Sequence, residues 1–237
     1  MLGIFVLLVT SWLLFKFILK EELSRFWFLP LSRSLFSFIL GICILLFSFG
    51  IPFLIKNYAF SIKWEFNDSV STSVLLDAFW FYTKSVLTEE LVFRGILLSM
   101  LLHFSTSRIA LIASSLLFGI YHWFSYGMFG AGIIPMLYVL ILTGSFGFVW
   151  AYMYLKTESI VLPVTFHLGW NFTSSLIYEY QPFGELLFSS ERTREVSELN
   201  SFLIQFGTDL LAIGLALIAF RVIWKHKKSR IILTRPS

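Results

Sequence analysis

Residues 109–155 read IALIASSLLFGIYHWFSYGMFGAGIIPMLYVLILTGSFGFVWAYMYL, a run of 47 residues without a single Asp, Glu, Lys or Arg. A helix that crosses a membrane needs roughly 20 mainly apolar residues, so this run is long enough for two crossings. Turn-forming residues mark the break between the two, namely Gly127, Gly130, Gly132 and Pro135. The stretch therefore predicts a pair of membrane-spanning helices.

The composition of the whole chain agrees with a membrane protein. Hydrophobic residues make up 57% of the 237 residues and charged residues only 14%, whereas ordinary soluble domains carry about 25% charged residues. This balance excludes a water-soluble globule. It also excludes a disordered chain, because disordered chains contain few hydrophobic residues. The single cysteine, Cys43, excludes an intrachain disulfide framework and a cysteine-rich metal site.

The apolar segments predict an all-α, polytopic helical bundle of about seven transmembrane helices. We expect residues 1–237 to form a single membrane-embedded domain, with spans at about 2–19, 34–55, 74–103, 109–126, 133–155, 159–178 and 201–224. The segment 74–86 carries Asp77 and Lys84, so it is compatible either with a crossing or with a position at the membrane interface.

The distribution of basic residues predicts the orientation of the chain. One side of the predicted bundle collects twelve basic residues, from the segment 16–33, Arg108, Lys156 and the tail 221–237. The opposite side collects four: Lys56, Lys63, Arg192 and Arg194. This asymmetry predicts a multi-pass protein of the cell membrane with its N-terminus outside and its C-terminus in the cytoplasm. The basic tail is typical of contact with membrane lipid, and we expect no nucleic-acid partner.

Three charged residues fall within one apolar helix, in Thr88-Glu89-Glu90-Leu91-Val92-Phe93-Arg94. Each charge near the centre of a span costs roughly 2.5–3.5 kcal/mol. Glu90 and Arg94 can pair at i,i+4, whereas Glu89 lies about 100° away around the helix and needs another partner. The cluster alone is compatible with an internal ion-pair staple.

Two histidines on other predicted helices favour a functional site. His122 lies deep in the charge-free run, and His167 lies in the sixth predicted span one turn before Asn171. Ionisable residues inside a membrane face a cavity or one another, because lipid does not solvate them. We therefore expect Glu89, His122, His167 and Asn171 to converge on one polar pocket between the central spans. Trp150 and Asp209 are interpreted as packing or helix-contact residues.

Together these residues form three motifs that resemble those of a known family of membrane enzymes. The motifs are Glu89-Glu90-x-x-x-Arg94, Phe118-x-x-x-His122 and His167-x-x-x-Asn171. They are similar to the motifs of the CAAX protease and bacteriocin-processing family, intramembrane proteases related to the CAAX prenyl endopeptidase of the Rce1 type. The resemblance covers a catalytic core of about residues 85–175.

The resemblance implies a glutamic-type endopeptidase, with Glu89, His122, His167 and Asn171 as catalytic residues. Glu89 would activate a water molecule that His122 also holds, and His167 and Asn171 would donate hydrogen bonds to the oxyanion. Glu90 and Arg94 would support the helix without taking part in the chemistry. The implied substrate is a membrane-associated peptide or protein, such as a precursor peptide, a C-terminal sorting tail or a prenylated CAAX protein.

Two alternatives stay open at this point. A zinc ion held by Glu89, His122 and His167 would match the ligand set of some catalytic zinc sites. The sequence lacks the compact H-E-x-x-H arrangement, and the resemblance favours a reaction without a cofactor or metal. The second alternative is a bacteriocin self-immunity or peptide-binding membrane protein without proteolysis. A transporter is disfavoured, because the sequence shows no repeated halves.

Overall fold

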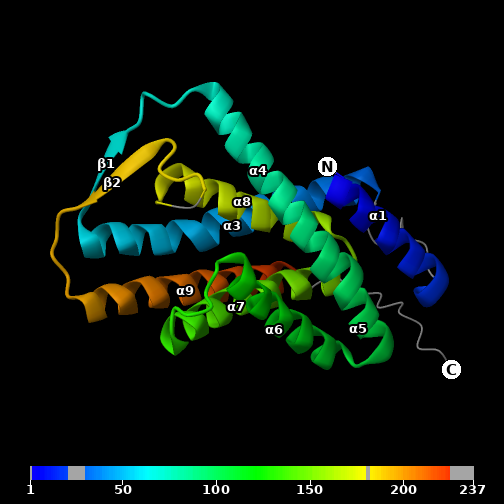
Figure 1. The fold of residues 1–237 in the computed structure, drawn as a ribbon. Coiled ribbons are helices and arrows are strands. Elements are labelled where there is room, and N and C mark those ends of the chain that lie inside the picture. The colour runs from blue at the N-terminus through cyan, green and yellow to red at the C-terminus, as the bar shows by residue number, and fades with distance from the viewer. Residues whose placement is uncertain (1, 21–29, 180–181, 225–237) are drawn as a thin grey trace.

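The computed structural model describes residues 2–20, 30–179 and 182–224, and most of these residues are helical (Figure 1). The helices are α1 (Leu2–Leu14), α3 (Leu31–Phe60), α4 (Thr72–Glu90), α5 (Ser99–Phe104), α6 (Ser107–Ser125), α7 (Ile133–Thr157), α8 (Val161–Ile177) and α9 (Glu198–Trp224). Two π-helical segments, Phe15–Leu19 and Leu91–Leu98, continue α1 and join α4 to α5. The predicted class of helical membrane protein is confirmed.

The seven predicted spans all coincide with helical segments of the structure. Among the described residues, three helices are long and apolar enough to cross a membrane by length and composition, namely α3, α7 and α9. The segment Gly3–Leu19 is apolar but shorter. A count of seven crossings therefore stays a prediction, and so does the orientation. Arg25 and most of the basic tail, residues 225–237, lie outside the described residues.

The predicted turn between α6 and α7 is confirmed. Gly127, Gly130 and Gly132 have φ values of +62°, +94° and +92°, which residues with a Cβ rarely adopt. The two helices then pack closely because small residues face each other along them. A Cβ on Gly119 would lie 2.9 Å from the carbonyl oxygen of Leu140, and one on Gly144 would lie 3.3 Å from that of Ser115. Small residues allow the same close approach in other membrane bundles.

A two-stranded antiparallel sheet at one end of the bundle was not predicted. Strand β1 (Ile62–Phe66) pairs with β2 (Phe188–Arg192), and Trp64 lies opposite Ser190. The sequence Ile-Lys-Trp-Glu-Phe alternates apolar and polar residues, as strands do, but its partner lies far away in the chain. The sheet lies at the opposite end of the bundle from the turn between α5 and α6 (Figure 1).

The close contact of α6 with α7 can be tested with Gly119→Ala. The new methyl group should overpack the interface, which typically costs about 1–3 kcal/mol and exceeds the gain of up to about 1 kcal/mol in helix propensity. The thermal midpoint in detergent should fall, by about 2–4 °C per kcal/mol. Gly214→Ala is the matched control, because no atom of the described residues lies within 4 Å of its Cβ position. A midpoint for Gly119→Ala at or above that of Gly214→Ala would contradict the close contact.

The two ends of the bundle can be located relative to the membrane by cysteine labelling in a Cys43→Ala background. Ser69 follows β1 and Ser107 begins α6, and both are exposed. A membrane-impermeant maleimide should label Ser69→Cys in intact cells and Ser107→Cys only after permeabilisation. Labelling of both positions from the same side would contradict the predicted topology.

Candidate active site

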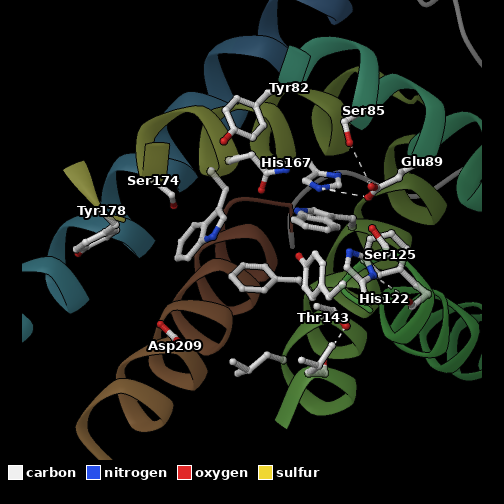
Figure 2. Close-up of a pocket in the computed structure, with 18 of the residues that line it drawn as sticks. Tyr82, Ser85, Glu89, His122, Ser125, Thr143, His167, Ser174, Tyr178 and Asp209 are labelled. Atoms are coloured by element: carbon white, nitrogen blue, oxygen red, sulfur yellow. Dashed lines mark hydrogen bonds and ion pairs between the residues drawn. The ribbon is translucent and has the colours of Figure 1, made fainter. Parts of the chain in front are cut away.

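A cavity of about 980 Å³ lies between the helices, and all four predicted catalytic residues line it. Figure 2 labels Glu89, His122 and His167 in this cavity. Glu89 comes from the end of α4, His122 from α6, and His167 and Asn171 from α8. Both histidines are buried, with 5% and 3% of their surface exposed. The structure therefore brings together residues that are up to 82 positions apart in the sequence.

The carboxylate of Glu90 and the guanidinium of Arg94 form a buried ion pair beneath the cavity. Arg94 Nη1 lies 3.1 Å from Glu90 Oε1, and Nη2 donates to the carbonyl oxygen of Gly147 at 3.1 Å. The guanidinium carbon also lies 4.6 Å from the centre of the Phe118 ring, a distance at which a cation attracts an aromatic face. The predicted i,i+4 contact is present, and Arg94 lies in the π-helical segment.

His167 is held on three sides. Its Nδ1 lies 2.8 Å from Glu90 Oε1, and its Nε2 lies 3.8 Å from Glu89 Oε2. The indole of Trp150 stacks on the imidazole with ring centres 3.7 Å apart and an angle of 16°. Because an ionised carboxylate only accepts hydrogen bonds, Nδ1 carries a proton when Glu90 is ionised. Glu90 thus orients His167 as well as pairing with Arg94, a contact that the sequence did not indicate.

His122 has its ring fixed by its own helix. Its Nδ1 lies 2.8 Å from the carbonyl oxygen of Phe118, one turn earlier. A carbonyl oxygen only accepts, so Nδ1 carries the proton and Nε2 of the neutral ring is left as an acceptor. Asn171 is half-buried on the cavity wall, one helical turn beyond His167.

Glu89 occupies the most isolated position in the cluster. Its Oε1 accepts a long hydrogen bond of 3.4 Å from the hydroxyl of Ser85, one turn earlier on α4. Its Oε2 is buried, and no hydrogen-bond donor reaches it within the described part of the chain. A buried oxygen without a donor is costly. Glu89 therefore offers an acceptor to whatever enters the cavity.

Sequence reasoning missed two residues that shape this site, Trp150 and Ser85. Trp150 was interpreted as a packing or interface residue, because nothing in a run of apolar residues shows which ring will face a histidine. Ser85 lies four residues before Glu89, so its helical spacing was the available signal. Within residues 2–20, 30–179 and 182–224, no group of three or more His, Cys, Asp or Glu side chains is arranged to hold a metal ion.

Comparison with known proteins gives a family match over this region. The model of the family "Type II CAAX prenyl endopeptidase Rce1-like" matches residues 71–173, which contain all three motifs. "Putative membrane peptidase YdiL" of Bacillus subtilis (strain 168) is 29% identical over 183 residues, which cover 74% of this chain and 68% of that protein. No solved structure matches the chain significantly.

The matched segment is somewhat less than half of the chain, and it spans α4 to α8. The helices that carry the buried charges are therefore the ones that the family shares. The resemblance seen in the motifs is confirmed: residues 71–173 of this chain match the Rce1-like family.

Proposed function

We propose that this protein is an intramembrane endopeptidase in which Glu89 activates water for hydrolysis of a membrane-associated peptide or protein. One observation carries the proposal: Glu89 Oε2 faces His167 Nε2 at 3.8 Å while Glu90 holds the opposite ring nitrogen at 2.8 Å. The Glu89 carboxylate and an imidazole fixed by Glu90 thus meet at one wall of a cavity large enough for a peptide segment.

The attack on the peptide begins with a water molecule between Glu89 and His122. The Glu89 carboxylate accepts one proton of the water, and the free Nε2 of His122 accepts a hydrogen bond from the other. The water oxygen then bonds to the carbonyl carbon of the substrate, and the carbonyl electrons move to its oxygen. General-base action of this kind typically contributes about 10²–10⁴-fold in rate.

The resulting oxyanion needs hydrogen-bond donors. Asn171 supplies an amide N–H, and His167 supplies Nε2–H when the ring is protonated on both nitrogens. The C–N bond then breaks as Glu89 returns its proton to the leaving amine, which restores the starting carboxylate.

The scaffold around these groups keeps them in place during the reaction. Trp150 fixes the plane of His167, and Arg94 neutralises Glu90 without reaching the cavity, because it is 1% exposed. In this proposal the reaction uses no metal. We also propose that the N-terminus lies outside the cell and the C-terminus in the cytoplasm. A prenylated CAAX peptide is the first substrate to test, since the family description names prenyl endopeptidases.

Glu89→Gln tests the general base. The amide keeps the shape of the side chain but cannot take a proton, so cleavage should fall by about 10²–10⁴-fold while the protein still inserts and purifies. The assay is cleavage of internally quenched peptides in proteoliposomes: a prenylated CAAX peptide, its unprenylated form and an apolar leader peptide. Glu65→Gln is the control, because Glu65 is exposed on β1 outside the cavity.

Equal cleavage by the wild type and Glu89→Gln would remove Glu89 as the base and favour a peptide-binding or immunity role. The metal content of the purified wild type should be measured in parallel. Stoichiometric zinc, with inhibition by chelators and recovery on adding zinc, would keep the peptidase but replace the mechanism proposed here.

Asn171→Ala and Arg94→Ala should separate a catalytic from a structural loss. Asn171→Ala removes one oxyanion donor, so the rate should fall by about 10²–10³-fold with an unchanged thermal midpoint. Arg94→Ala leaves Glu90 buried without its cation, and removing one partner of a buried pair typically costs about 3–5 kcal/mol. Its thermal midpoint and yield should therefore fall together with activity. A stable, monodisperse Arg94→Ala protein would show that Glu90 does not depend on this ion pair.

A further inference from the structure

A second polar cluster lies in the same cavity, well away from Glu89. Lys56 of α3 donates to Asp209 Oδ1 of α9 at 2.8 Å, and the hydroxyl of Tyr138 of α7 donates to Oδ2 at 3.3 Å. The ring of Tyr178, which follows α8, lies 5.5 Å from Lys56 Nζ. Figure 2 shows Asp209 and Tyr178 on one side of the cavity and Glu89 and His122 on the other.

Hydrogen-bonding capacity in this cluster is unevenly used. Both oxygens of Asp209 accept a hydrogen bond, one from Lys56 and one from Tyr138. An ammonium has three donors, and within the described part of the chain Asp209 is the one acceptor that Lys56 contacts. The groups left without a partner are therefore N–H donors of the Lys56 ammonium, and these would bind an anion in preference to an amine.

The pair is also open to the cavity. The side chain of Lys56 is 18% exposed and that of Asp209 is 21% exposed, whereas Arg94 and Glu90 are 1% and 0% exposed. If the pair only joined α3 to α9, apolar side chains of similar volume would often serve as well or better. Partial exposure inside a cavity lined by aromatic rings leaves room for a ligand atom beside Lys56.

The spacing between the two clusters corresponds to a short peptide. Tyr178 lies eleven residues after His167, directly beyond the end of α8, and Tyr138 precedes Trp150 by twelve residues on α7. At 1.5 Å per residue, both helices give about 16–18 Å. An extended peptide rises about 3.3 Å per residue, so about five residues would cover the length of helix between His167 and Tyr178, whose ring lies beside Lys56.

We propose, building on the peptidase function above, that Lys56 binds a carboxylate of the substrate about five residues beyond the scissile bond. The carboxylate accepts hydrogen bonds from the free N–H groups of Lys56, while Asp209 and Tyr138 hold the ammonium in place. Lys56 is thus a specificity-determining residue that fixes the distance between the cleavage point and an anionic group. The terminal carboxylate of the substrate or an acidic side chain could supply that group.

The test uses three libraries of short acetylated apolar peptides: free acids, carboxamides, and carboxamides that carry one Asp at varied positions. Cleavage by the full-length protein in proteoliposomes is measured by mass spectrometry, which also locates the cut. We expect cleavage about five residues before a free terminal carboxylate and at least about tenfold weaker cleavage of the plain carboxamides. Recovery of cleavage by a correctly spaced Asp would identify a side chain as a sufficient anion.

Variants show whether Lys56 causes the preference. Lys56→Met with Asp209→Asn removes both charges, so neither is left unpaired, and the preference for acids should disappear. Lys56→Arg should retain it. Lys63→Met is the matched control, because Lys63 is an exposed cation on β1 outside the cavity. If the double variant fails to fold, the comparison of acids and carboxamides with the wild-type protein still tests whether the carboxylate site exists.

Equal cleavage of acids and carboxamides by the wild type would overturn the carboxylate site and leave the peptidase standing. If the wild type cleaves no peptide, the proposed function fails. Equilibrium binding of the same libraries then tests the carboxylate site separately from proteolysis. Binding of acids about tenfold tighter than carboxamides, lost in the double variant, would support the site without proteolysis. Equal binding would overturn it.

Discussion

The carboxylate of Glu90 is the point on which the rest of the site depends. A single oxygen, Oε1, lies 3.1 Å from Arg94 Nη1 and 2.8 Å from His167 Nδ1. A charge buried this deeply is stable only with partners, so α4 and α8 must meet with Glu90 and His167 in register. That register places the opposite ring nitrogen, Nε2, toward Glu89. The order of the two adjacent glutamates thereby separates a structural carboxylate from one that faces the cavity.

The helices around this contact adapt to it. Arg94 lies in the π-helical segment Leu91–Leu98, and such segments are frequent at functional sites. Its guanidinium reaches α7 at the carbonyl oxygen of Gly147, where a Cβ would lie 2.9 Å from the Phe118 ring. The small residue therefore allows α6 and α7 to enclose the arginine. The burial of the ion pair therefore depends on the close packing of α6 and α7.

Much of this could be predicted from the sequence, because the deciding signals are local. Apolar length located the helices, the glycines at 127–132 located the turn, and charges that lipid would not solvate pointed to the site. The missed features depend on partners that are distant in the chain. Strand β1 needs β2, Trp150 needs His167, and Lys56 needs Asp209, 153 residues later. The π-helical segment that contains Arg94 is likewise not encoded in helix propensity.

The ion pair beneath the cavity and the one that lines it differ in a way that stability alone does not explain. Apolar side chains of similar volume often stabilise a protein as well as a buried ion pair does, or better, and lipid would accept them readily. The pairs Glu90–Arg94 and Lys56–Asp209 are therefore expected to stabilise the fold no more than apolar side chains of similar volume would. The first pair is sealed and fixes an imidazole, whereas the second is partly open and retains free donors. The first pair lies beneath the cavity and the second lines it, which is consistent with a site that fixes its reactive groups at one end and binds a ligand at the other.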